Sequence, residues 1–382
     1  MGAEKNRSRN IMRVLWIIAS ALTGAAVILW IRRMGVGLIY AYTGLILLFL
    51  VRIVDISIHE LGHLVGGLMS GYRFVCIEIA GLTVSRAADG RLRIGRMNLP
   101  GANGHCLMEP PEIKNGKMPY RMLGAGGILA NLIAAVAFGM AAFRADGPTA
   151  RMLFTVFAIW NAADVLINGI PFRGYVDNDA QNLLEMSRSQ EAVRKYRQGM
   201  MMSVMKFRGV RIKDMPEEWF YLPTDEELRS STLAVDDAFQ YYYRLEAQDR
   251  DEEAERLTDR LLAEGVPLND GQRAVLRINR AIAEMKKGVK TQEECLGISE
   301  KWLDGPTKQY ISALGRSPNG LRVQYALAML VKGHIYKARQ LEEEYDEAVR
   351  KHPMIRNEEE DKKFFREIRE AYERRKMEEG QK

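Results

Sequence analysis

The residues of this chain best suited to chemistry are those of the segment His59-Glu60-Leu61-Gly62-His63. On a helix, His59 and His63 lie one turn apart, so both imidazoles point from the same face. That spacing suits two nitrogen ligands of a tetrahedral Zn²⁺ ion. Glu60 lies further round the helix, where it can reach a metal-bound water as general base. The segment therefore predicts a hydrolytic zinc site.

The motif follows a hydrophobic run over residues 36–54 that is interrupted only by Arg52. A run of this length can enter a membrane. Ionisable side chains inside a membrane helix are energetically costly, and they usually mark functional sites. Two histidines on an apolar helix can also be ordinary buried residues, but the membrane setting favours the metal site.

A catalytic zinc ion needs a third protein ligand and keeps one position open for water. A metzincin would supply a histidine six residues after His63, but Met69 occupies that position. Glu78 could act as the downstream glutamate of a thermolysin-like enzyme. However, the alternating pattern around Glu78 is more typical of a solvent-facing residue on a strand.

A better source of the third ligand is the polar segment 168–179. Pro171 ends the regular helix before it and frees backbone groups. Irregular backbone at membrane depth is tolerated only where it lines a cavity. Two aspartates of this segment, Asp177 and Asp179, could return to the metal, and the segment alone leaves the choice between them open.

The two halves of the chain differ in composition, and a length of 382 residues predicts two domains. Nearly all long apolar runs lie in residues 1–190, whereas residues 190–382 are rich in charged side chains. The net charge of +6 is modest and the basic residues are scattered, so we expect no nucleic-acid partner. Three cysteines provide no disulfide framework and are compatible with a reducing compartment: Cys76, Cys106 and Cys295.

Four apolar runs predict transmembrane helices, at residues 14–30, 36–54, 124–143 and 152–170. The first is expected to be retained, because no small-residue cleavage site of a signal peptide stands out.

Residues between the second and third runs have a different pattern. Alternation predicts short strands at 74–79 and 92–94 with a turn at 88–90, and Gly and Pro residues predict a loop over 101–119. His105 in that loop is expected to be an ordinary loop or surface residue, as are His334 and His352.

From residue 187 onward the pattern is typical of soluble helices, with Leu257, Leu261 and Leu262 at helical spacing. Residues 322–353 predict two antiparallel helices broken at Gly333-His334, a hairpin about the size of a tetratricopeptide unit. No second unit repeats this pattern. The charged stretch 357–382 is expected to be a helix that frays or is disordered.

The expected fold class is an α-helical polytopic membrane protein with a small membrane-associated β segment and a C-terminal all-α soluble domain. The expected domains are an N-terminal tail with the first transmembrane helix (1–34), a membrane core that carries the motif (35–186) and a helical domain (187–382). Basic residues place the N-terminal tail and the 71–123 loop in the cytoplasm, with the C-terminal domain on the same side after four crossings. We expect a multi-pass protein of a bacterial cell membrane.

Several features occur in the order typical of the site-2 protease family of intramembrane zinc metallopeptidases (peptidase family M50), which this sequence resembles over about residues 35–185. The motif helix is followed by a strand-rich segment, and residues 126–131 resemble the family's small-residue helix signature. Asn168, Pro171 and an aspartate resemble its Asn-x-x-Pro…Asp-Gly motif. The spacing after Pro171 is longer than in the commonest members, and Ala180 follows Asp179 where the family has Gly.

The resemblance implies an intramembrane zinc endopeptidase whose metal is held by His59, His63 and Asp179, with Glu60 as the catalytic base. Asp179 is favoured because it directly precedes a helical stretch, as the family's aspartate does; Asp177 is the second choice.

The substrate of such an enzyme would be a membrane-protein or peptide chain in the lipid bilayer. Asn131 and Asn168 could hydrogen-bond that substrate or the oxyanion, or could simply join helices. Asp55 could orient His59, although a charge at the membrane interface is the favoured interpretation. The helical C-terminal domain could recruit substrate or a cytoplasmic protein. Because Ala180 follows Asp179 where the family has Gly, an alternative remains open: a catalytically inactive membrane scaffold or receptor.

Overall fold

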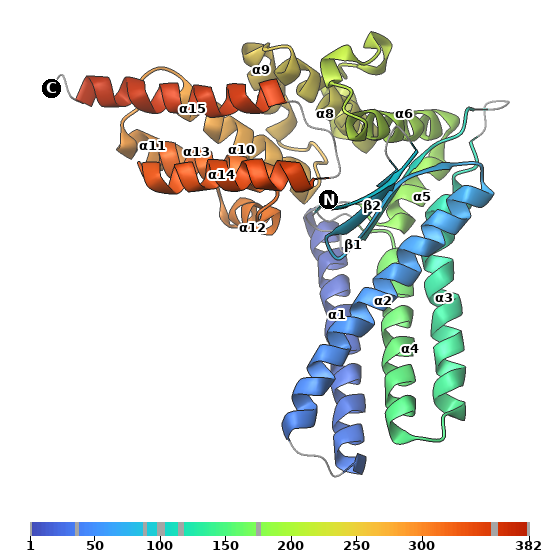
Figure 1. The fold of residues 1–382 in the computed structure, drawn as a ribbon. Helices are drawn as coiled ribbons and strands as arrows, with labels where there is room; N and C mark the ends of the chain where they lie inside the picture. Colours follow the sequence, from blue (N-terminus) through green and yellow to red (C-terminus); the bar gives the residue numbers. More distant parts are fainter. Residues whose placement is uncertain are drawn as a thin grey trace. The chain divides into compact units, whose positions relative to one another are not determined.

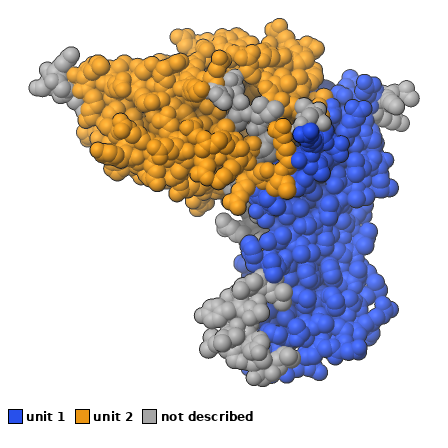
Figure 2. Space-filling view, viewed as in Figure 1, with its two compact units in different colours: residues 1–92, 102–200 blue, residues 93–101, 201–382 orange. Residues whose placement is uncertain are grey.

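The computed structural model describes residues 2–34, 38–86, 90–97, 104–113, 118–172, 177–352 and 358–379. These residues are mostly helical and include a small four-stranded sheet (Figure 1). The chain divides into two compact units, which Figure 2 shows in different colours. The first contains residues 1–92 and 102–200, and the second contains residues 93–101 and 201–382.

Long helices occupy all four of the predicted apolar runs in the first unit. They are α1 (Gly2–Met34), α2 (Leu38–Met69), α3 (Arg121–Arg144) and α4 (Pro148–Gly169). Helix α3 packs against both α2 and α4, and α4 packs against α1 (Figure 1). Among the described residues, α3 and α4 are long and apolar enough to cross a membrane.

Small residues let α2 and α3 approach closely. A Cβ atom added to Gly62 would lie 2.6 Å from the Cβ atom of Ala130 and would collide with the carbonyl oxygen of Gly126. A Cβ atom on Gly66, one turn further along α2, would collide with the carbonyl oxygen of Met122. This close approach brings α3 against the part of α2 that carries the histidine motif.

The sheet contains β1 (Arg73–Ile79), β2 (Leu82–Arg86), β3 (Leu92–Arg96) and β4 (Gly104–Glu109) in the order β3-β2-β1-β4. Strand β1 pairs antiparallel with both β2 and β4. The two predicted strands are thus confirmed.

The prediction of a loop over 101–119 is wrong for residues 104–109. These residues form β4 and pair with β1 despite the Gly and Pro residues around them. His105 consequently lies on a strand and not in a loop. The turn predicted at 88–90 falls mostly outside the described residues.

Helix α4 is followed in the chain by two shorter helices, α5 (Asp179–Arg188) and α6 (Gln190–Phe207). The rest of the chain contains short 3₁₀ turns and helices α7 (Asp225–Ser230), α8 (Thr232–Ala247), α9 (Asp251–Leu262), α10 (Asp270–Lys286), α11 (Gln292–Trp302) and α12 (Gly305–Leu314).

The predicted hairpin is confirmed as α13 (Pro318–Leu330) and α14 (Ile335–Lys351), with a break at Gly333, which has a φ angle of +64°.

The last helix, α15 (Glu358–Glu379), confirms the helix expected in this charged stretch. Its Phe365 ring packs against Tyr325 and Tyr345, with ring centroids 4.7 and 4.9 Å apart. Ile368, on the same face, is fully buried. A narrow apolar stripe therefore attaches this charged helix to the core of its unit.

Candidate metal centre

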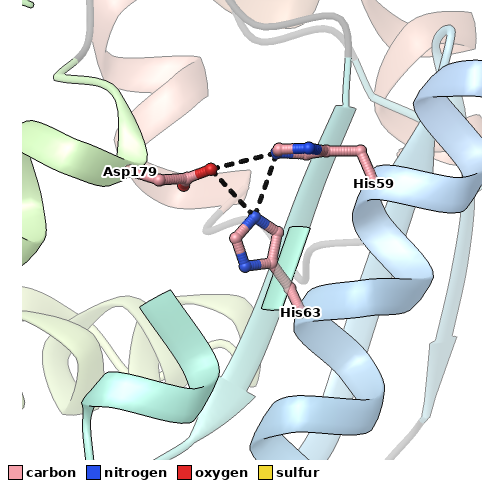
Figure 3. A group of neighbouring side chains, drawn as sticks. All are labelled: His59, His63 and Asp179. Atoms are coloured by element: carbon pink, nitrogen blue, oxygen red, sulfur yellow. Dashed lines mark hydrogen bonds and ion pairs between the residues drawn. The ribbon is translucent and has the colours of Figure 1, made fainter. Parts of the chain in front are cut away.

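Helix α2 presents His59 and His63 toward the first residue of α5, Asp179 (Figure 3). The Nε2 atoms of the two histidines are 3.1 Å apart. The Oδ2 atom of Asp179 lies 3.0 Å from Nε2 of His59 and 3.2 Å from Nε2 of His63. Among the described residues, these three side chains form a group whose ligand atoms lie within 4.8 Å of one another.

The structure places the other two candidate ligands outside this group. Asp177, the second choice, lies two residues before Asp179 and is not a member of the group. Glu78 is buried, with 2% of its surface exposed, which corrects the expectation of a solvent-facing strand residue. Its carboxylate accepts a hydrogen bond from the backbone N–H of Gly81, in the turn between β1 and β2.

The hydrogen bonds of His63 fix which of its nitrogens carries the proton. Its Nδ1 atom lies 2.7 Å from the carbonyl oxygen of Leu123 in α3. Because a carbonyl oxygen can only accept, Nδ1–H must donate. In the neutral ring, the lone pair is then on Nε2, the atom that faces His59 and Asp179.

Asn131 fixes His59 in the same way from α3. The side-chain amide nitrogen of Asn131 donates to Oδ1 of Asn161 at 2.9 Å and to Oδ1 of Asp55 at 3.3 Å. Its Oδ1 atom is therefore the one that faces Nδ1 of His59, at 2.5 Å. An amide oxygen only accepts, so Nδ1–H of His59 donates and Nε2 is left as an acceptor.

With both imidazoles neutral, three acceptor atoms therefore converge without a proton between them. Oδ2 of Asp179 is buried and has no hydrogen-bond partner among the described residues. Acceptors this close repel one another unless a cation or added protons lie between them. Two imidazole nitrogens and one carboxylate oxygen are the donor set of a catalytic zinc site with an open fourth position. The residues present thus fit a zinc ion.

The charge state of Asp179 suits this role. Burial alone would raise the pKa of its carboxyl group, but hydrogen bonds and charge interactions with the imidazoles of His59 and His63, when these carry protons on Nε2, outweigh burial and hold the pKa of Asp179 well below its usual range. A metal cation in the place of those protons would stabilise the carboxylate in the same way.

A buried ion-pair network lies behind His59. Asp55 is completely buried and forms an ion pair with Arg52, which also pairs with Asp164 of α4 at 3.1 Å. The guanidinium of Arg52 lies 4.5 Å from the ring centroid of Trp160. Asp55 is thus a buried, paired carboxylate inside the first unit. Its link to His59 passes through Asn131, which contacts both.

Two glycines leave space for the reactive groups. A Cβ atom on Gly127 of α3 would lie 2.6 Å from Nε2 of His63 and 2.7 Å from Nε2 of His59. A Cβ atom on Gly104, at the start of β4, would lie 2.8 Å from the carboxyl carbon of Glu60. Neither position could carry a larger residue without moving the groups beside it.

The two asparagines predicted as substrate-binding residues have different surroundings. The Asn131 side chain is completely buried and contacts protein atoms. Asn168, in the last turn of α4, makes no side-chain hydrogen bond to any described residue and is partly exposed. The pairing of Arg52 with Asp164 was not predicted, although opposite charges in two neighbouring apolar runs were a usable signal.

We compared the chain with models of protein families, with curated proteins and with solved structures, and found no match.

Proposed function

We propose that this protein is an intramembrane zinc metalloendopeptidase of the site-2 protease type, which hydrolyses a peptide bond of a transmembrane or membrane-associated polypeptide. One observation carries the proposal: His59 and His63 of the motif helix meet Asp179, from a distant part of the chain, with three ligand atoms within 4.8 Å of one another. Sequence spacing alone could not have arranged this convergence.

The chemistry follows from the positions of the side chains. A Zn²⁺ ion held by His59, His63 and Asp179 would polarise a peptide carbonyl and lower the pKa of a water at the open position. Glu60 follows His59 on α2 and is buried beside the site. Its carboxylate would take the proton of the attacking water and pass it to the nitrogen of the leaving amine.

The surface of the first unit supports immersion in a membrane. Exposed apolar side chains occur on α1, α2, α3 and α4, among them Ile17, Phe49, Ile133 and Leu166. Apolar surface on each of these helices, around a polar interior, is typical of a protein in contact with lipid. We therefore propose four crossings, with the N-terminus, the 71–123 segment and the C-terminal domain in the cytoplasm.

Strand β4 offers a route for the substrate. Among the described strands it pairs with β1 alone, so its other edge can accept an extended chain. Gly104, the first residue of this strand, lies against the carboxyl group of Glu60. An unwound substrate paired with β4 would pass the general base, and Asn168 could bind its carbonyl groups. The helical domain would recruit substrate or a cytoplasmic regulator.

The test combines metal analysis with cleavage. Purified wild-type protein should contain about one zinc per chain, and Glu60→Gln should retain it because the glutamine leaves the three ligands in place. Mass spectrometry of new peptide termini in membranes should find products with the wild type that are missing with Glu60→Gln. Equal cleavage by the two proteins would reject the mechanism, and a wild type without zinc affinity would support the inactive scaffold.

A further inference from the structure

The position of Asp179 depends on the connection between α4 and α5. Helix α4 ends at Gly169 and Asp179 begins α5, so the intervening residues must bring the carboxylate back to α2. A carboxylate ligand must be held within about 0.5 Å of its productive place. Something in this connection must therefore fix the start of α5 relative to the end of α4.

Asn178, the residue immediately before Asp179, makes four hydrogen bonds with its side chain. Its amide nitrogen donates to the carbonyl oxygens of Ile167 and Ile170, each at 2.7 Å. Its amide oxygen accepts from the backbone N–H groups of Phe172 and Gln181, each at 3.0 Å. A primary amide has two donors and two acceptor positions, so the full capacity of this side chain is used.

These bonds connect three pieces of backbone. Ile167 and Ile170 lie at the C-terminal end of α4, where carbonyl groups lack partners within the helix. Gln181 lies in the first turn of α5, so the bond to its N–H is an N-cap. One side chain thus caps the start of one helix and satisfies carbonyls at the end of another.

Asn178 also closes the base of the loop. Its backbone N–H donates to the carbonyl oxygen of Phe172 at 3.2 Å, while its side chain accepts from the N–H of Phe172. Residues 172 and 178 are therefore joined in both directions. The longer spacing between Pro171 and Asp179 then need not move Asp179 away from α2, because these bonds join the two ends of the loop immediately before Asp179.

We propose that Asn178 is the positioning residue of the metal ligand Asp179: its four-bonded amide fixes the first turn of α5 to the end of α4. This proposal rests on the proposed zinc site but concerns a different residue and a different property. Asn178 itself does not touch the metal or the substrate. Its effect should therefore appear in the affinity and geometry of the metal site.

The experiment compares zinc affinity in two variants of the full-length protein. Asn178→Ser retains a side-chain oxygen that can cap α5 but loses both donors to α4. Asn178→Asp keeps both bonds that the side-chain oxygen accepts, including the cap of α5, and also loses both donors to α4. If Asn178→Ser fails to fold, Asn178→Asp tests whether the bonds to α4 position Asp179. Asn182→Ser is the matched control, because the side chain of Asn182 makes one long bond, 3.5 Å, to the backbone oxygen of Asp177.

Competition with a chelator should show zinc affinity reduced about 10- to 100-fold in both Asn178 variants and unchanged in Asn182→Ser. In the Co²⁺-substituted proteins, the visible absorption bands should change in the Asn178 variants alone, because these bands report ligand geometry. Wild-type affinity and spectrum in the folded Asn178→Asp protein would overturn the positioning role while leaving the zinc site intact. A wild type that binds neither Zn²⁺ nor Co²⁺ would instead reject the proposed function and this inference with it.

Discussion

The side-chain oxygen of Asn131 lies 2.5 Å from Nδ1 of His59, on the side of the ring away from Asp179. Because Asn131 donates its amide hydrogens to Asp55 and Asn161, this oxygen can only accept from His59. A structural asparagine in α3 thus selects the tautomer of a proposed metal ligand in α2. Partners of this kind orient the ring and raise its basicity.

Replacing Asn131 should therefore weaken metal binding. We expect Asn131→Leu to reduce zinc affinity by about 10- to 100-fold, because His59 loses its acceptor and becomes free to rotate. Asn168→Leu should leave zinc affinity unchanged, since Asn168 makes no side-chain hydrogen bond to a described residue. It should reduce cleavage, because Asn168 is proposed to bind the carbonyl groups of the substrate. Chelator competition and a cleavage assay on the same two proteins separate these effects, and the reverse ranking would contradict both assignments.

The two neighbouring aspartates provide a second prediction. Asp179→Asn should lower zinc occupancy strongly, because only the Asp179 carboxylate reaches both histidines. Asp177→Asn removes the same charge two residues away and serves as the control. Zinc per chain after dialysis gives the answer. A greater loss in Asp177→Asn would transfer the ligand role to Asp177.

The local part of the site could be predicted from residue spacing, whereas its long-range part, Asp179, was predicted only through the family resemblance. His59, Glu60 and His63 follow from helical spacing alone. The segment 168–179 offered two aspartates, and the choice between them depends on the turn that Asn178 closes. No periodicity encodes such a turn, because it depends on side-chain bonds to distant backbone.

The fold shows the same division. The long helices were predicted because their apolar runs are longer than any strand. Strand β4 was missed because its pairing with β1 joins residues far apart in the sequence. The attachment of α15 did have a signal, since Phe365, Ile368 and Tyr372 recur at helical spacing within the charged stretch.

Gly127 gives a prediction with a control in the same helix. In Gly127→Ala, the new methyl group would lie 2.6 Å from Nε2 of His63, so the histidines must shift and zinc occupancy should fall. Gly139→Ala places its methyl group in open space and should preserve zinc binding. It should also stabilise the helix by up to about 1 kcal/mol. Full zinc occupancy in Gly127→Ala would show that the site is wider than the structure indicates.

The proposed topology can be tested with single cysteines in a background without the three natural ones. Position 146 lies in the connection between α3 and α4, and position 343 lies on α14; both side chains are exposed. A membrane-impermeant thiol reagent applied to intact cells should label a cysteine at Asp146 and spare one at Glu343. Both should react after the cells are lysed. Labelling at position 343 in intact cells would overturn the cytoplasmic placement of the helical domain.

The buried carboxyl group of Glu78 should make the stability of the first unit depend on pH. Burial raises the pKa of Glu78 to about 7, although the hydrogen bond from Gly81 opposes the shift. A carboxyl group whose pKa is raised in the folded state binds its proton more tightly there, so stability falls as pH rises from about 4.5 to about 7. Above that range, Glu78→Gln should be more stable than the wild type by roughly 1–3 kcal/mol.

Below about pH 4.5 this advantage should vanish, because the wild-type carboxyl group is then neutral in both states. Thermal unfolding of the two proteins from pH 4 to pH 8 measures the difference. Glu112→Gln is the control, since Glu112 is exposed and its substitution should give a difference near zero throughout. If Glu78→Gln were equally stable to the wild type at pH 8, the carboxylate of Glu78 would have to be solvated in the folded protein.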